Sequence, residues 1–231
     1  MVRNKKKIIV VGGGGFTHKS DKDLDDFVIN QVNKSNIDIG FLPTASNDDQ
    51  NKIDLFYERF QSKNLKLSHF NLCSSVDGFK DWIFKKDLIY IGGGNTFKMI
   101  DLWKRYNLIN IFRKAYENGI ILSGVSAGGV CWFDWILSDS LSKNFSHIKG
   151  ISLLSGSCTP HSSDNNRLQQ FIIDIKNENL PDGLAIDDGV AVLFIDGVPS
   201  EVYSSRINHD AYHINKHDKV SLKTHIKNLN G

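Results

Sequence analysis

The sequence predicts an α/β fold, a three-layer α/β/α sandwich in which helices cover both faces of a mostly parallel central sheet. Three observations predict it. Short β-branched runs alternate with amphipathic helical stretches over the first 130 residues, and glycine-rich or polar loops follow the strands. Short strands with Asp-Gly turns come later, at Asp188-Gly189 and Asp196-Gly197. The alternation indicates parallel strands with crossover helices, and the turns indicate a C-terminal antiparallel extension of the same sheet.

The expected elements follow one another closely. Apolar runs ending in Gly, Pro or polar residues predict parallel strands at 7–11, 37–42, 66–72, 88–91 and 120–122. Apolar residues at helical spacing, such as Ile53, Phe56 and Phe60, predict helices at 21–32, 53–62, 76–84, 97–106 and 108–117. Ser20 or Asp21 is the expected N-cap of the first helix. In such sheets ligands bind at the carboxyl ends of the strands.

The second half is less regular. We expect a helix and then a loop over 130–160, a helix over 167–177, and antiparallel strands at 183–187, 190–195 and 201–203. The tail after about residue 207 is weakly patterned and is left unassigned. No linker or repeat divides the chain, so a single domain over 1–231 is expected.

Composition excludes several function classes. The chain has 231 residues, 40% of them hydrophobic and 23% charged, and a net charge of +2, too small to indicate a nucleic-acid or membrane partner. No apolar run approaches the roughly 18 residues of a membrane span. Cys73, Cys131 and Cys158 have no metal-like spacing, so we expect free, buried thiols in a cytoplasmic protein, with no metal or cofactor.

A candidate nucleophile follows the strand at 120–122. Gly124-Val125-Ser126-Ala127-Gly128 matches the G-x-S-x-G elbow, where a strained turn between strand and helix exposes the serine hydroxyl. Three fixed positions match by chance in roughly one chain of this length in ten, and such a turn can merely open a helix. The apolar strand before it and the apolar segment after it favour a nucleophilic Ser126.

A serine nucleophile needs a base, a group that orients the base, and donors for the oxyanion. Among eight histidines His161 is favoured, because it follows an apolar segment and Pro160 fixes the backbone before it. Local pattern leaves the acid open, since each candidate also suits a turn or cap; the candidates are Asp139, Asp164, Asp187 and Asp188.

Two glycine loops could serve a ligand. Gly92-Gly93-Gly94-Asn95 could cradle a phosphate, form a plain turn, or donate N–H groups to an oxyanion. An oxyanion loop with the Ala127 N–H as second donor fits best beside an elbow serine. Residues 12–15 have the same ambiguity, with nucleotide binding as a weaker alternative.

Taken together, the motifs at 39–45, 91–97, 124–128, 138–140 and 160–161 resemble the dipeptidase E and cyanophycinase-like family of serine peptidases, over residues 7 to about 198. The resemblance implies a flavodoxin-like, class I glutamine-amidotransferase-like sandwich with serine replacing cysteine at the elbow. It implies that Ser126 is the nucleophile, His161 the base and Gly94 an oxyanion donor.

The same resemblance implies two candidates for the carboxylate behind His161 and a set of substrate-binding residues. Asp139 matches the family Asp shortly after the elbow, and Asp188 lies where some members carry a Glu that orients the histidine. Asp188 is slightly favoured because it would come from a neighbouring strand end. Arg167 is the nearby basic candidate for a substrate carboxylate; the expected substrate-binding residues are Gly93, Asn95 and Arg167.

The leading hypothesis is therefore a cytoplasmic, metal-free serine peptidase that hydrolyses small peptides through an acyl-enzyme. Whether it prefers an acidic N-terminal residue is left open. The expected partner is a small peptide, and a homodimer is left open. The alternatives are another acyl hydrolase, such as an esterase of the α/β-hydrolase fold, and a non-catalytic ligand-binding domain. The last would lack an imidazole within reach of the Ser126 hydroxyl.

Overall fold

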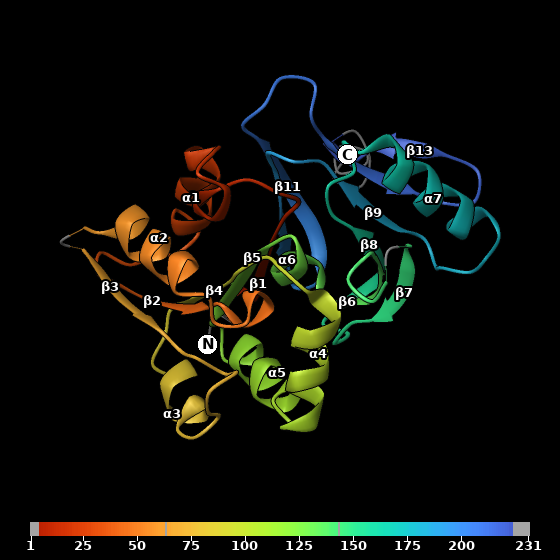
Figure 1. The fold of residues 1–231 in the computed structure, drawn as a ribbon. Helices are drawn as coiled ribbons and strands as arrows, with labels where there is room; N and C mark the ends of the chain where they lie inside the picture. The colour runs from red at the N-terminus through yellow and green to blue at the C-terminus, as the bar shows by residue number, and fades with distance from the viewer. Residues whose placement is uncertain (1–4, 63, 143, 224–231) are drawn as a thin grey trace.

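The main sheet confirms the predicted α/β fold class. The computed structural model describes residues 5–62, 64–142 and 144–223. Seven strands lie in the order β11-β10-β1-β5-β4-β2-β3 (Figure 1). Five are parallel to one another: β1 (Lys7–Val11), β2 (Ile37–Leu42), β3 (Leu65–His69), β4 (Leu88–Ile91) and β5 (Ile121–Val125). The other two, β10 (Val190–Ile195) and β11 (Val198–Ser204), form the predicted antiparallel extension beside β1.

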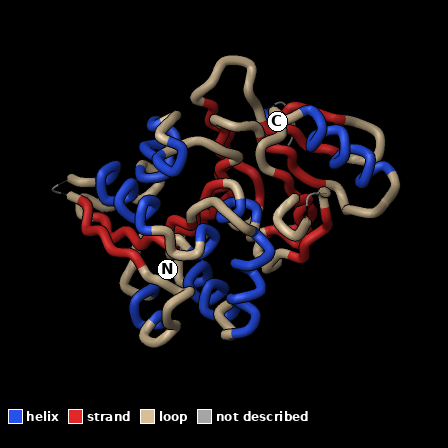
Figure 2. Tube along the Cα trace, in the orientation of Figure 1, coloured by secondary structure: helices blue, strands red, loops and turns tan. Residues whose placement is uncertain are grey.

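Helices cover both faces of this sheet (Figure 2). One face carries α1 (Lys22–Ile29) and α2 (Gln50–Phe60), and the other carries α3 (Phe79–Ile83), α4 (Thr96–Arg105) and α5 (Ile109–Glu117). Alternate residues of β1 supply the two cores, because successive side chains of a strand point to opposite faces. Ile9 and Val11 pack with α1 and α2, whereas Ile8 and Val10 pack with α3 to α5.

Several element boundaries differ from the sequence predictions. The helix α2 begins three residues early, because the Asp49 side chain accepts the Asn51 N–H at 2.8 Å and caps it. Asp21 precedes α1 but does not cap it; its backbone is left-handed (φ 50°) and its carboxylate pairs with Arg206. The predicted helix at 76–84 is confined to α3.

A second sheet replaces the helix and loop expected over 130–160, and that prediction was wrong. Its order is β13-β12-β9-β8-β6-β7. The strands are β6 (Phe133–Ser138), β7 (Ser146–Lys149), β8 (Leu154–Thr159), β9 (Gly183–Ile186), β12 (Ala211–Ile214) and β13 (Lys219–Ser221). We had predicted that the strand at 183–187 extends the main sheet, but β9 belongs to the second sheet. The tail beyond residue 207, which was left unassigned, contributes the strands β12 and β13. Residues 224–231 lie outside the described residues.

Small residues explain why β8 was missed. Its sequence Leu-Ser-Gly-Ser-Cys-Thr has little strand propensity, but its backbone pairs with β6 on one side and β9 on the other. The helix α7 (Asn165–Lys176) covers this second sheet through Leu168, Phe171 and Ile175. Tertiary pairing therefore decides this region against local preference.

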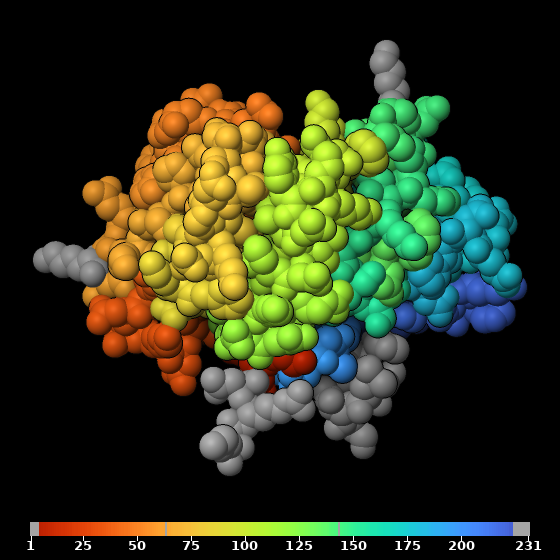
Figure 3. Space-filling model, turned by 90° about the horizontal axis from the view of Figure 1, so that it is seen from below, coloured from red at the N-terminus to blue at the C-terminus, as the bar shows by residue number. Residues whose placement is uncertain are grey.

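The two sheets share one core. Ile8 and Val10 of the main sheet belong to the same buried cluster as Phe133, Ile136 and Cys158 of the second. Seen from below, the surface of the second half adjoins that of the first (Figure 3). Among the described helices, none is long and apolar enough to cross a membrane.

The cysteines only partly match expectation. All three are free thiols; Cys131 and Cys158 are buried as predicted, and burial raises their pKa well above the ordinary value. Cys73 is exposed instead, so the prediction of three buried thiols was wrong at that position.

Candidate active site

Ser126 lies at the turn between β5 and the short helix α6 (Ala127–Val130). Its backbone is strained, with φ 53° and ψ −119°, and its N–H donates to the Val11 carbonyl at 2.9 Å. Small neighbours are required: a Cβ at Gly124 would lie 2.3 Å from the Gly128 oxygen, and one at Gly128 would lie 2.3 Å from the Ile91 oxygen. Ser126 therefore lies in a tight, strained turn between a strand and a helix.

His161 and Asp188 reach Ser126 from the second sheet. They follow β8 and β9, which are parallel neighbours, so their carboxyl ends meet at one edge. His161 Nε2 lies 2.8 Å from Ser126 Oγ, and His161 Nδ1 lies 2.5 Å from Asp188 Oδ1. A carboxylate only accepts, so Nδ1 carries the proton and Nε2 is left to accept from the serine hydroxyl.

Asp188 remains ionised at neutral pH. The hydrogen bond from His161 holds the pKa of its carboxyl below the ordinary value, against partial burial, and the charges of Arg206 and His18 act in the same direction as His161. A carboxylate in this position stabilises an imidazolium on His161. His161 itself adopts a left-handed backbone (φ 54°), which turns its side chain back toward the main sheet and Ser126.

Gly13 makes room for this pair, a role that the sequence did not reveal. A Cβ at Gly13 would lie 1.8 Å from Asp188 Oδ1 and 2.7 Å from His161 Nδ1. The Gly13 carbonyl also accepts the Gly189 N–H at 2.8 Å. The first glycine loop, left ambiguous above, thus packs directly against the histidine and the carboxylate.

The other candidate acids make different contacts. Asp139 pairs with the guanidinium of Arg167 at 3.0 Å. Asp164 caps α7 through the Asn166 N–H at 2.9 Å. Asp187 accepts from the Ser162 hydroxyl at 2.6 Å. Among the four candidates, Asp188 is the one that the structure brings to His161.

Arg167 is committed to protein contacts. Besides the pair with Asp139, its guanidinium lies 4.9 Å over the Phe145 ring, and the residue is buried. This arrangement does not support the expected role in holding a substrate carboxylate.

The second glycine loop adjoins Ser126. A Cβ at Gly93 would lie 3.4 Å from the Ser126 Cβ. Gly94 requires glycine, since its φ is 147° and a Cβ there would lie 2.1 Å from the Ala45 oxygen. Within the described part of the chain, no backbone hydrogen bond uses the N–H of Gly94 or Ala127 as a donor. The two N–H groups are therefore candidate donors to an oxyanion.

Asn95, expected to bind substrate, instead holds the loop. Its Oδ1 accepts the Lys98 N–H at 2.8 Å and caps α4, while its Nδ2 donates to the Ser140 carbonyl at 2.8 Å. Its polar atoms thus join α4 to the loop after β6.

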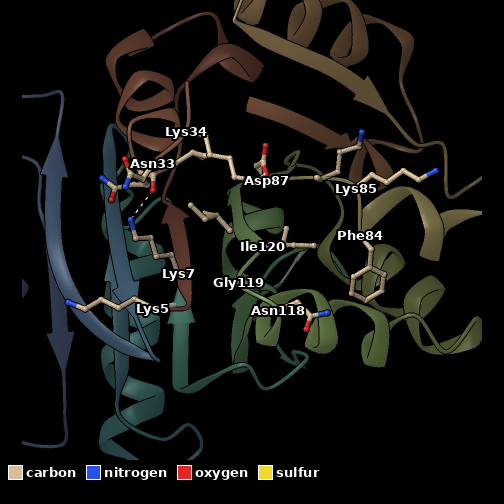
Figure 4. Close-up of a pocket in the computed structure, with 14 residues that line it drawn as sticks. Lys5, Lys7, Asn33, Lys34, Phe84, Lys85, Asp87, Asn118, Gly119 and Ile120 are labelled. Carbon is tan, nitrogen blue, oxygen red and sulfur yellow. Dashed lines mark hydrogen bonds and ion pairs between the residues drawn. The ribbon is translucent and has the colours of Figure 1, made fainter. Parts of the chain in front are cut away.

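A cavity of about 230 Å³ opens beside Ser126, lined by Thr17 and His18, by Gly93 and Gly94 of the second glycine loop, and by Lys52 of α2. A larger cavity, about 660 Å³, lies at the opposite edge of the sheet, where β1 and β5 begin (Figure 4). Two of its lysines have carboxylate partners: Lys34 pairs with Asp87, and Lys86 pairs with Asp38. Ligand sites of doubly wound sheets lie at strand carboxyl ends, so the smaller cavity is the candidate site.

Comparisons with known proteins identify the family of the chain. The model of a family described as peptidase family S51 matches residues 8–201. An uncharacterized peptidase, YgaJ, of Bacillus subtilis (strain 168) is 36% identical over 229 residues, covering 97% of this chain and 99% of that protein.

Solved structures share the fold. A peptidase from an acI-B1 actinobacterium superimposes with a TM-score of 0.67 at 15% identity, covering 94% of each chain. A putative peptidase E protein from Listeria monocytogenes EGD-e gives a TM-score of 0.62 at 16% identity, covering 88% of this chain and all (100%) of that one.

Proposed function

Because the chain belongs to peptidase family S51 and is a serine peptidase, we propose that it hydrolyses small peptides through an acyl-enzyme formed on Ser126. The observation that carries the proposal is the 2.8 Å contact between His161 Nε2 and Ser126 Oγ. A serine hydroxyl is a weak nucleophile, and a base within hydrogen-bond reach is the usual means of activating it.

The proposed reaction proceeds in two halves. Ser126 Oγ attacks the peptide carbonyl while His161 Nε2 takes the hydroxyl proton, and the resulting imidazolium is stabilised by Asp188. His161 then gives that proton to the leaving amine as the C–N bond breaks, which leaves an ester on Ser126. Water attacks the ester, again losing its proton to His161, and the acid product leaves as Ser126 regains its hydroxyl proton.

The oxyanion is assigned to the N–H groups of Gly94 and Ala127. Neither N–H has a backbone acceptor among the described residues; Ala127 follows Ser126 in the chain, and Gly94 lines the same cavity as Ser126. Such donors stabilise the charge that develops on the carbonyl oxygen, typically by about 3–4 kcal/mol per donor. Gly93 leaves the substrate free to approach, because it presents no side chain beside the Ser126 Cβ.

The contacts of Ser126 also bear on the alternatives. A non-catalytic domain was expected to lack an imidazole near the Ser126 hydroxyl, whereas His161 bonds to that hydroxyl and Asp188 bonds to His161. The same acyl-enzyme chemistry cleaves esters, so the experiment below compares ester hydrolysis with peptide hydrolysis. A cytoplasmic location stays part of the proposal.

The test is hydrolysis of a dipeptide library with Asp-X, Glu-X and neutral-X members by the wild type and Ser126→Ala. The variant should lose dipeptide hydrolysis and labelling by a fluorophosphonate. Equal rates for the two proteins would contradict the proposal. A far faster turnover of p-nitrophenyl esters than of any dipeptide would favour an esterase. The library also measures whether the enzyme prefers an acidic N-terminal residue, which the resemblance to dipeptidase E leaves open.

A further inference from the structure

The cavity beside Ser126 has a basic lining. One lysine, Lys52, lines it and no acidic residue does; the lining is Thr17, His18, Ser46, Lys52, Gly93, Gly94 and Ser126. A peptide in this cavity meets positive charge next to the nucleophile. Its amino terminus is disfavoured there, whereas a carboxylate is attracted.

A hydrogen bond to the backbone of Thr17 holds the Lys52 side chain at this cavity. Lys52 lies in the first turn of α2, half-buried, and its ammonium donates to the Thr17 carbonyl at 2.6 Å. An ammonium has three donors, so two remain after this bond. The contact with Thr17 therefore positions the charge at the cavity and leaves donors for a ligand.

The charge of Lys52 is not neutralised within the described residues. No carboxylate among them lies within ion-pair distance of its ammonium, whereas Lys34, Lys66 and Lys86 each have an acidic partner. A bound carboxylate would supply the anionic partner that this ammonium lacks among the described residues, through a charge-assisted hydrogen bond.

The neighbouring His18 lines the same cavity and lies close to the base. Its ring lies 6.4 Å from the ring of His161, centroid to centroid, and its Nδ1 contacts the Gly14 carbonyl at 3.1 Å. Nδ1 also lies 2.9 Å from the Thr17 hydroxyl, so Nε2 is the ring nitrogen that these contacts leave unused.

We propose that Lys52 binds a carboxylate of the peptide substrate in the cavity beside Ser126, an inference that rests on the proposed function. Two carboxylates of a peptide have this chemistry: the side chain of an acidic N-terminal residue and the C-terminal carboxylate of a dipeptide. Arg167, the basic residue that the sequence suggested for this task, is paired with Asp139.

Two substrate pairs separate these sources. Asp-Leu against Asn-Leu differs in the side-chain carboxylate, and Asn-Leu against Asn-Leu amide differs in the terminal one. The proteins are the wild type, Lys52→Gln, Lys52→Met and Lys52→Arg. Lys52→Gln keeps a donor for the Thr17 carbonyl but carries no charge. Lys66→Met, at an exposed lysine on β3, is the matched control for net charge.

The wild type should favour the carboxylate member of one pair. In Lys52→Gln and Lys52→Met the kcat/KM ratio of that pair should fall by about 10- to 100-fold, mainly through KM, the range expected for losing a charge-assisted hydrogen bond. Lys52→Arg should keep part of the ratio, and Lys66→Met all of it. The pair whose ratio falls identifies the carboxylate.

Different outcomes overturn the inference and the proposed function. If Lys52→Gln lowers kcat/KM equally for all substrates, or changes nothing, Lys52 only supports the Thr17 segment and the inference is wrong. If the wild type hydrolyses none of the peptides, or Ser126→Ala is as active as the wild type, the proposed function fails and the inference falls with it.

Discussion

The carboxylate of Asp188 lies 2.5 Å from Nδ1 of His161, whereas the carboxylate of Asp139 pairs with Arg167 at 3.0 Å. Parallel pairing of β8 and β9 produces the first contact, because it places the residues after the two strands side by side. Asp139 follows β6, the next strand of the second sheet, and is bound to α7 instead. The two candidate acids therefore differ in what they can do to the imidazole.

Asp188→Asn should lower kcat by about 10³- to 10⁴-fold, since an amide no longer fixes the Nδ1–H tautomer or stabilises the imidazolium. Asp139→Asn should change kcat by less than about threefold, because the Asp139 carboxylate pairs with Arg167 and does not contact the imidazole of His161. Steady-state rates on the best dipeptide of the library compare the two. A larger loss for Asp139→Asn would show that Asp139 acts on the reaction.

Gly13→Ala should lower kcat by more than about 100-fold, the usual cost of displacing a catalytic group by about 1 Å. The added Cβ would lie 1.8 Å from Asp188 Oδ1, so the carboxylate and His161 must move. Gly93→Ala is the control for adding a methyl group at a glycine near the site, because its Cβ would lie at an ordinary 3.4 Å from the Ser126 Cβ. Thermal unfolding should show Gly93→Ala to be folded normally. Wild-type kcat in Gly13→Ala would contradict the assigned role of Asp188.

Arg167→Met should cost stability rather than selectivity. The substitution removes the pair with Asp139 and the contact with the Phe145 ring, together worth about 1 kcal/mol. The ratio of kcat/KM for Asp-Leu and Asn-Leu should equal that of the wild type. Urea unfolding and the two peptide rates measure both quantities. A fall in the ratio would restore Arg167 as the residue that binds the acidic side chain.

Much of the main sheet could be predicted because its strands carry their own signal. Ile8 to Val11 and Leu88 to Ile91 are uniformly apolar and end at glycine. The second sheet carries no such signal: β8 is rich in Ser and Gly and is a strand because β6 and β9 pair with it. Local propensity was overridden there by tertiary pairing.

The residues of the candidate site also divide into those with a local sequence signal and those placed by tertiary structure. Ser126 and His161 could be found because a tight elbow and a Pro-His loop are local patterns. The choice of Asp188 depends on which strand ends are neighbours, which no local pattern contains. Lys52 lay outside the helix predicted from residue 53, and only the earlier start of α2 brings it to the cavity.

Stability should depend on pH through Asp25, which is fully buried in α1. Burial raises the pKa of its carboxyl to about 7, although the Arg59 guanidinium at 3.1 Å opposes the shift. Between its ordinary pKa and about 7 the folded state holds a proton that the unfolded state has lost. The free energy of unfolding should therefore fall as pH rises through this window, by at most about 1.4 kcal/mol per pH unit.

Asp25→Asn removes this titration, so its stability should vary less between pH 4.5 and 7 (roughly the window set by the two pKa values) than that of the wild type. Asp26→Asn is the matched control, since Asp26 pairs with the same Arg59 but is exposed. Urea unfolding across the window measures the slope of the unfolding free energy against pH for each protein. Groups that titrate equally in the wild type and the variant cancel in the difference between the two slopes. If wild type and Asp25→Asn share one pH dependence, Asp25 is ionised in the folded protein throughout the window, and the Arg59 pair outweighs burial.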